Sequence, residues 1–417
     1  MQRHWGIKNA NGVQKMNEIF DPFSLIFLFL GCAFGTFTGL LPGIHPNTLI
    51  PISFLILPYI GSQNYVCFLI GMVITHYYIN YIPSAFIGVP DDETAVSVLP
   101  LHNLTLKGYG YEGVVLCGFG GFIGIIIALF LVFLIYSINF DLHGAYQSFK
   151  PFIPYVLILL LFATVIFSKN RFWSIVIIIL SGLFGIEVLH NHPSVNNILT
   201  AIFTGMFGIP LLFENLKTEK ITHQIITFPE LDLSILKSAF AGTIGGFIRI
   251  FLPAIGGSQI NFFLSKLIRE NDIKNFLVSQ GAITLSNEVF SILALLLIGY
   301  GRSGTAVAIK NLSIDLNFNV VVYMLIVAGL GYGILCFISK YFLKYISYFD
   351  YGKISFYLIL FCSAVVFVLG YFSNYLFYYL VVYVLSACLG ILCVKSKVNM
   401  SYMMSVLVFP TVLYYIT

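Results

Sequence analysis

Charged side chains are scarce inside the apolar runs of this sequence, and the few that occur there are the first candidates for chemistry. Three acids follow one another at Asp91-Asp92-Glu93, and Arg249, Glu288 and Arg302 occur further along the chain. An ionised group within a membrane is costly unless it is paired or hydrated, so such residues are functional candidates by default. Carboxylates can hold a proton or a cation, whereas guanidinium groups bind anions. These residues therefore predict a site that binds ions or charged ligands.

The composition indicates which elements must position these residues. Hydrophobic residues make up 59% of the 417 residues and charged residues 9%, against about 25% charged in an ordinary soluble domain. Such a chain cannot cover a soluble surface with charge, so we expect an integral membrane protein. This excludes most classes of soluble enzyme, nucleic-acid binders and disordered scaffolds. The net charge of +4 implies no polyanionic partner, and the lipid bilayer is the expected environment.

The apolar runs predict an all-α integral membrane protein with about 10–12 transmembrane helices and two structural repeats that contain broken or re-entrant helices. The expected organisation is a polar N-terminal segment at 1–19, a first membrane half at 20–213 with the first repeat, a polar connector at 214–234, and a second membrane half at 235–417 with the second repeat and extra C-terminal helices. Met16 is a second candidate for the start of the protein. We expect a multi-pass protein of the cell membrane.

Two parts of the sequence match at a constant offset of 211 residues. Leu41-Pro42 corresponds to Leu252-Pro253, since 252 − 41 = 211. Glycine pairs match as well, and their i, i+4 spacing predicts a helix face open to close packing. The further matches are Gly31 with Gly242, Gly35 with Gly246, His76 with Asn287, and Thr94-Ala95-Val96 with Thr305-Ala306-Val307. These matches predict an internal duplication.

A proline follows each glycine pair and predicts a break in the helix. The first break runs from Pro42 to Thr48 and the second from Pro253 to Gln259. Backbone groups released by proline and glycine must face protein or a water-filled cavity, so paired breaks indicate the midplane site of a transporter. The alternative is a pair of ordinary loops between spanning helices. Polar residues at these breaks are expected to cap the half-helix that follows, namely Asn47, Thr48, Ser258 and Gln259.

The N-terminus of a half-helix carries partial positive charge, so the two breaks predict a site for an anion. The arginines are expected to add positive charge there, and the acids to bind a coupling proton or cation. The residues expected to bind the substrate are Pro42, Gly43, His45, Asn47, Thr48, Gly256, Gly257, Ser258, Gln259, Arg249, Arg302 and Ser303. The residues expected to bind the coupling ion are Asp91, Asp92, Glu93 and Glu288.

Each charged candidate also has a structural interpretation. Arg249 and Glu288 could form an ion pair with each other, and the acidic triplet could be a solvated loop in which Asp91 or Asp92 caps a helix. A membrane-embedded lipid-modifying enzyme that uses His45, His76 and the acids is a different function class. The histidines lack metal-ligand spacing, and no nucleophile, phosphate-binding or dinucleotide motif is present. We therefore expect no enzymatic activity, no metal and no cofactor.

The motifs resemble the large membrane subunit, TctA, of the tripartite tricarboxylate transporters, and in particular a shorter, archaeal type. The resemblance covers most of residues 24–310. The segments that carry it are Gly39–Thr48, Phe86–Gly113 with Leu99-Pro100-Leu101-His102 and Lys107-Gly108-Tyr109-Gly110-Tyr111-Glu112-Gly113, Leu252–Gly256, and Gly299–Ala306.

The resemblance implies secondary, ion-coupled uptake of an organic anion, usually a carboxylate. It also implies a small membrane subunit and an extracytoplasmic substrate-binding protein as partners, and a homodimer is a further expectation. The chain departs from the family pattern at Asp91-Asp92-Glu93, where the family usually has small neutral residues. The pattern of prolines and glycines is also similar to that of polyprenyl-phosphate translocases, so translocation of an anionic lipid headgroup is the alternative.

Overall fold

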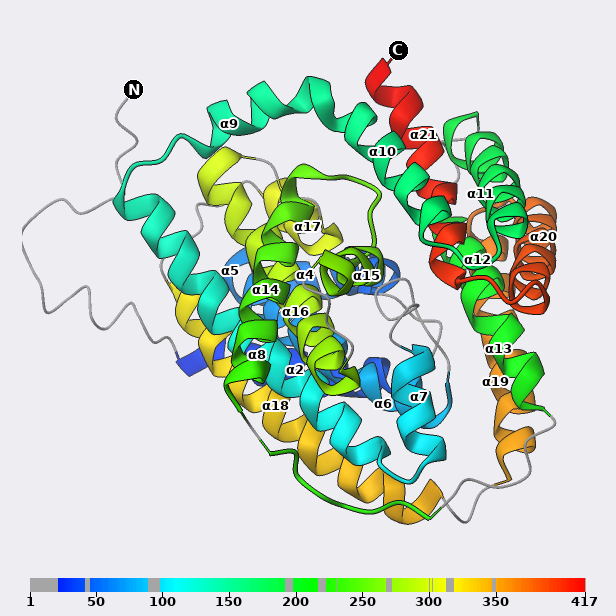
Figure 1. The fold of residues 1–417 in the computed structure, drawn as a ribbon. Coiled ribbons are helices and arrows are strands. Elements are labelled where there is room, and N and C mark those ends of the chain that lie inside the picture. The colour runs from blue at the N-terminus through cyan, green and yellow to red at the C-terminus, as the bar shows by residue number, and fades with distance from the viewer. Residues whose placement is uncertain are drawn as a thin grey trace, which may run out of the picture.

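The computed structural model describes residues 22–41, 46–88, 98–191, 198–216, 223–230, 232–267, 272–299, 301, 303–312, 319–346 and 350–416. The regular elements within these ranges are helices (Figure 1). Nine of the described helices are long and apolar enough to cross a membrane, and three shorter apolar helices accompany them. The predicted all-α membrane fold is therefore confirmed.

The helices follow the two halves of the sequence. Those of the first half are α2 (Pro22–Gly39), α3 (Pro46–Ser53), α4 (Leu57–Ile60), α5 (Ser62–Ile79), α6 (Tyr81–Phe86), α7 (Val98–Leu106), α8 (Gly110–Ser137), α9 (Leu142–Phe149), α10 (Ile153–Ile166), α11 (Arg171–Gly185), α12 (Ile198–Phe203) and α13 (Ile209–Asn215). Those of the second half are α14 (Leu233–Phe251), α15 (Gly257–Leu267), α16 (Ile273–Ile298), α17 (Gly304–Asn311), α18 (Asn319–Ile346), α19 (Tyr351–Phe372), α20 (Leu376–Lys395) and α21 (Ser405–Ile416).

Short polar side chains determine where several of these helices begin. Each accepts a hydrogen bond from a backbone N–H in the first turn and so satisfies a donor that has no partner within the helix. The capping residues are Asp141, Asn170, Asp232, Asp272, Ser303 and Asp350.

The offset of 211 residues also holds in space. α2 packs along α5, and α14 packs along α16. A Cβ atom added to Gly31 would meet the carbonyl oxygen of Phe68, and one added to Gly242 would meet that of Ser279, where 68 + 211 = 279. The corresponding contacts one turn later are Gly35 with Met72 and Gly246 with Ile283. The predicted close packing of both glycine pairs is confirmed.

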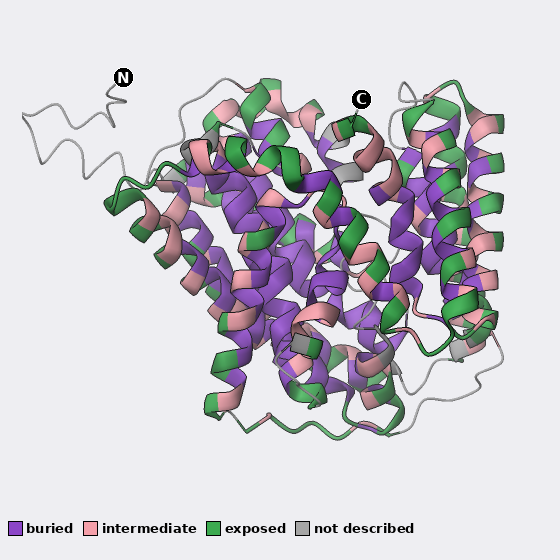
Figure 2. Ribbon diagram, turned by 45° about the horizontal axis from the view of Figure 1, so that its top comes forward, coloured by how far each residue is buried: buried purple, intermediate pink, exposed green. Residues whose placement is uncertain are grey.

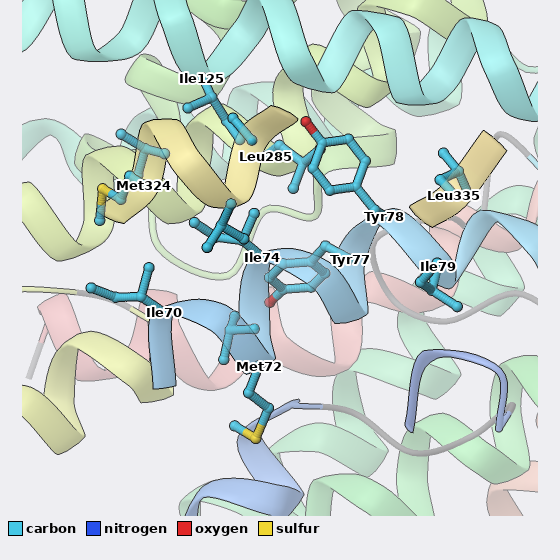
Figure 3. Packing of buried hydrophobic residues seen from close by; sticks show 14 of the residues in the cluster. Ile70, Met72, Ile74, Tyr77, Tyr78, Ile79, Ile125, Leu285, Met324 and Leu335 are labelled. Atoms are coloured by element: carbon cyan, nitrogen blue, oxygen red, sulfur yellow. The ribbon is translucent and has the colours of Figure 1, made fainter. Parts of the chain in front are cut away.

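The two halves interlock through their long helices. α8 packs against α16, and α18 packs against α5, so each contact crosses from one half to the other (Figure 1). The two contacts are equivalent under the offset, because α5 corresponds to α16 and α8 to α18. Figure 3 shows the shared core, in which Tyr78 of α5, Ile125 of α8, Leu285 of α16 and Met324 of α18 lie together.

The other long helices build a second core beside the first. It contains residues of α11, α12, α20 and α21, and the π-helical turn at Thr204–Gly208 packs against α20. α10 and α11 pack against α21, and α13 packs against α19, so this core also mixes the two halves. Buried residues fill the interior, whereas the outer helix faces are exposed (Figure 2). Aromatic residues such as Phe356 and Phe377 are exposed there, as expected for a surface in contact with lipid.

The connector between the halves holds the corner between α7 and α8. Gly108 takes a left-handed φ of +89° that turns the chain between the two helices. In the connector segment 223–230, the Gln224 Oε1 atom accepts a hydrogen bond from the Gly110 N–H at 3.0 Å. Its Nε2 atom donates to the Thr105 carbonyl oxygen at 2.7 Å. The Gln224 side chain therefore pairs with a backbone acceptor at the end of α7 and with a backbone donor at the start of α8.

Two further residues of the first turn of α8 contact neighbouring elements. The Lys274 Nζ atom of α16 lies 2.7 Å from Glu112 Oε1. The Tyr111 ring packs edge-on against the Phe228 ring of the connector, with the ring centroids 5.6 Å apart. The glycine- and tyrosine-rich motif at 107–113 therefore builds a structural corner.

Candidate functional site

Part of the predicted site lies outside the described residues, and the roles assigned to that part stay predictions. These residues are Pro42, Gly43, His45, Asp91, Asp92, Glu93 and Arg302. Asn47 and Thr48 belong to α3, but their side chains are also outside the description. The backbone of α3 packs against α17. The helix after the first break therefore meets the short helix that follows α16 in the other half.

The second break is a tight left-handed turn between α14 and α15. Ala254 has a φ of +65°, a conformation that costs a residue other than glycine about 1 kcal/mol. The Arg249 Nε atom donates a hydrogen bond to the Ile255 carbonyl oxygen at 3.2 Å, and the Arg249 side chain is buried. This bond spans the turn and stabilises it. Arg249 therefore has a structural role at the break and brings positive charge to it.

Gln259 caps α15, as the sequence predicts. The Gly256 N–H donates to Gln259 Oε1 at 3.3 Å. This is the contact of a capping box, in which the side chain of the third helical residue accepts from the backbone N–H of the N-cap residue. The Gln259 Nε2 atom donates to the Ser401 carbonyl oxygen at 3.0 Å, in the short 3₁₀ turn before α21. Gly257 and Ser258 are buried beside it. The N-terminus of the second half-helix is therefore closed over by the second core.

A buried carboxylate and a capping serine meet where α16 leads into α17. Glu288 is 0% exposed, and its Oε1 atom accepts a hydrogen bond from Ser303 Oγ at 3.0 Å. The Ser303 N–H donates to Ser291 Oγ at 2.6 Å, and Ser303 Oγ accepts from the Ala306 N–H at 3.1 Å. Gly299 provides the left-handed turn before them, with a φ of +68°. The structure thus brings together Ser303 and Glu288, which the sequence assigned to the substrate and the ion.

The offset places further polar residues at equivalent positions beside the two breaks. Thr38 corresponds to Arg249, since 38 + 211 = 249, and His76 corresponds to Asn287. A hydrogen bond of 3.0 Å joins Thr38 Oγ1 to His76 Nδ1, and both side chains are buried. The sequence reasoning did not single out Thr38. The offset of 211 residues could have indicated Thr38, because it aligns this threonine with Arg249.

His102 anchors the end of α6, directly before the acidic segment. A hydrogen bond of 2.9 Å joins its Nδ1 atom to the Ala85 carbonyl oxygen. A carbonyl can only accept, so Nδ1 carries the proton. A Cβ atom at Gly88, where φ is +72°, would lie 3.2 Å from the His102 ring. Burial lowers the pKa of His102, and the bond to Ala85 partly opposes this shift. His102 therefore holds the end of α6 and lies against the turn at Gly88.

Neutral polar side chains line the contact between α15 and α16, and the sequence reasoning missed them. The Asn261 Nδ2 atom donates to the Phe276 carbonyl oxygen and to Gln280 Oε1, both at 3.0 Å. The Gln280 Nε2 atom donates to Thr284 Oγ1 at 3.3 Å. All three polar residues are buried. Because they carry no charge, they did not stand out among the other residues of the apolar runs.

These observations define a multi-pass helical membrane protein with two interlocked repeats. Each repeat interrupts its chain after a glycine-packed helix, and charged or polar side chains gather beside the interruption. Such an architecture is typical of secondary transporters.

Comparison with known proteins identifies the family. The model of the tripartite tricarboxylate transporter TctA family matches residues 25–405, so this chain belongs to that family. It is 51% identical over 395 residues to the uncharacterized protein MJ1079 of Methanocaldococcus jannaschii, a match that covers 94% of this chain and 99% of the relative. No solved structure matches the chain. The predicted family resemblance and its archaeal type are confirmed, and the protein is a membrane transport component.

Proposed function

We propose that this protein is an alternating-access carrier for a small organic anion of the carboxylate class, coupled to a proton or a sodium ion. The observation that carries the proposal is the buried Glu288 in the middle of a spanning helix, together with the buried Arg249 at the end of α14. Charged groups inside a membrane protein are costly, so buried ones are functional candidates even where, as for Arg249, they also stabilise a turn.

The second break supports binding of an anion. It places the Arg249 guanidinium beside the N-terminus of α15, where the helix dipole adds partial positive charge. Arg302 adds a second positive charge in this proposal, close in sequence to Ser303. Glu288, with the acidic triplet Asp91–Glu93 of the first half, holds the coupling ion.

The contacts of Gln259 support a closed state of the carrier. Its hydrogen bond to the Ser401 carbonyl joins the start of α15 to the second core and buries Gly256 and Gly257. In the proposed cycle, the second core moves away from α15, this bond opens, and the substrate reaches the half-helix. A small membrane subunit and an extracytoplasmic binding protein are the proposed partners, as in the tripartite systems of this family.

The substrate class is testable by thermal stability of the purified protein. Carboxylates and short-chain lipid phosphates are added separately, since a ligand that binds the folded state raises Tm. We expect carboxylates to stabilise the protein. Stabilisation by lipid phosphates alone would overturn the carboxylate assignment and indicate a lipid-headgroup translocase.

The mechanism is testable by uptake of the stabilising carboxylate into proteoliposomes. We expect Glu288→Gln to abolish accumulation driven by an ion gradient while exchange of substrate persists. Glu112→Gln is the matched control, because Glu112 pairs with Lys274 at the helix end. Full accumulation by Glu288→Gln would refute its coupling role. If Arg302→Ala and Asp92→Asn both transport like wild type, the roles of those two residues are wrong.

A further inference from the structure

One buried oxygen in the contact between α15 and α16 has no hydrogen-bond donor among the described residues. It is Asn261 Oδ1, on a side chain that is 1% exposed. The orientation of the amide is certain on chemical grounds, because its other end lies 3.0 Å from the Phe276 carbonyl oxygen, which can only accept. The amide must therefore point its nitrogen at Phe276 and its oxygen away. A buried acceptor of this kind costs about 1–3 kcal/mol unless something binds it.

The first repeat shows that helix packing does not require these polar groups. α3 packs against α5 there, as α15 packs against α16 in the second repeat. The positions equivalent to Asn261, Gln280 and Thr284 are all apolar and buried, and are Ile50, Leu69 and Val73. The first half instead joins α3 to α5 through one hydroxyl pair, Ser53 Oγ with the Tyr65 hydroxyl at 2.7 Å, in which each group satisfies the other. The second half differs because its polar groups leave one acceptor, Asn261 Oδ1, open to a ligand.

The chemistry of the group indicates which ligand this is. Both N–H groups of the Asn261 amide are occupied, by Phe276 and by Gln280 Oε1, and the Gln280 amide donates to Thr284. The atom presented is an oxygen acceptor, which excludes an anion. These three side chains are neutral, whereas Ca²⁺ and Mg²⁺ sites rely on carboxylates. Neutral oxygens that replace a hydration shell suit a monovalent cation.

The surrounding packing favours a small ion. Asn261 follows Ile260 on α15, and a Cβ atom at Gly245 of α14 would lie 2.9 Å from Ile260 Cγ2 and 2.8 Å from Leu264 Cδ1. α14 therefore packs closely against Ile260 and Leu264 of α15, and the Asn261 side chain lies in the contact with α16. We infer that Asn261 Oδ1 is a ligand of a sodium ion bound between α15 and α16, with Gln280 and Thr284 as positioning residues that hold the amide in place. This inference rests on the proposed function, and it adds a sodium site between α15 and α16 to the coupling role proposed for Glu288.

The test is thermal unfolding of the purified full-length protein at constant ionic strength, with choline chloride replaced stepwise by NaCl or by KCl. We expect 100 mM NaCl to raise Tm by roughly 1–3 °C, with saturation, and KCl to have a smaller effect. Asn261→Leu should remove the increment due to sodium. Asn64→Leu is the matched control, because Asn64 Oδ1 already accepts from Ser24 Oγ at 2.9 Å, and it should keep the increment.

A second variant keeps the test decisive if Asn261→Leu does not fold. Thr284→Val retains the volume and removes the acceptor for Gln280, so the sodium midpoint should rise several-fold. Equal effects of NaCl and KCl on the wild type, or a full sodium increment in Asn261→Leu, would overturn the sodium site.

Uptake driven by a proton gradient in sodium-free medium tests the carrier separately. Carboxylate uptake in sodium-free medium, without a sodium-specific rise in Tm, would overturn the sodium site and leave the carrier intact. A sodium-specific rise in Tm, without carboxylate uptake under a proton or a sodium gradient, would support the site and refute the carrier.

Discussion

The glycine contacts predict that equivalent substitutions in the two repeats have unequal costs. A Cβ atom at Gly35 would fall on the carbonyl oxygen of Met72 and lie 3.0 Å from its Cα atom, so the three nearest atoms all belong to the backbone of α5. At Gly246 the nearest atom is the hydroxyl of Ser286, a side chain that can rotate, and the Ile283 carbonyl oxygen lies at 3.0 Å. Gly35→Ala must therefore push two helices apart, whereas Gly246→Ala mainly displaces one hydroxyl.

The magnitudes follow from two opposing terms. Overpacking costs about 1–3 kcal/mol, while replacing glycine by alanine within a helix gains about 1 kcal/mol. Backbone contacts place the overpacking cost at Gly35 at the upper end of this range, so we expect Gly35→Ala to lose about 1–2 kcal/mol, which lowers Tm by roughly 1–2 °C in a chain of this length, and Gly246→Ala to change Tm little. Gly329 of α18 has no atom within 4 Å of an added Cβ, so Gly329→Ala is the control and should not destabilise.

The assay is thermal unfolding of the three purified variants in one detergent, followed by uptake in proteoliposomes. Thr38 lies about one turn beyond Gly35, so displacing α2 should also weaken its contact with His76 and reduce uptake. A Gly35→Ala protein as stable as Gly329→Ala would refute the reasoning. A loss at Gly246→Ala equal to that at Gly35→Ala would refute the distinction between backbone and side-chain contacts.

Two further predictions concern the polar anchors around the site. Burial lowers the pKa of His102 from its ordinary 6.5, so the folded state prefers the neutral ring; this contribution to stability is complete above pH 6.5 and is lost as the pH falls through the lower folded pKa. His102→Asn should flatten the Tm profile between pH 7.5 and pH 5, and an unchanged profile would contradict this. Gln224→Leu leaves the Gly110 N–H and the Thr105 carbonyl without this partner and should cost about 1–3 kcal/mol in unfolding free energy. The exposed Gln147→Leu is its control, and equal Tm values for the two would contradict the bridging role.

Some of the site was predictable because its signals are local. Gly256 and Gln259 are three residues apart, so the cap of α15 could be read from spacing alone. Glu288 stood out because a carboxylate inside an apolar run is rare. Its bond to Ser303 was not predictable, because the turn at Gly299 decides which residue of the next helix faces back onto α16.

Other contacts left no signal in the sequence. Gln224 lies more than 100 positions from the helix ends that it joins, and an isolated glutamine in a polar connector looks like any solvated residue. Asn261 and Gln280 were overlooked because they carry no charge. Their importance emerges only when the apolar counterparts Ile50 and Leu69 are placed beside them.

The sequence by itself determined the membrane helices, the duplication and the two glycine-lined helix faces that are open to close packing. These depend on the length of apolar runs and on glycine spacing, which are properties of neighbouring residues. Only the tertiary structure decided that α8 packs on α16 and α18 on α5, and that Gln259 closes the second break by reaching Ser401. Apolar helices can pair in many ways in a bilayer, and the pairing adopted depends on shape and hydrogen bonds between residues that are far apart in the chain.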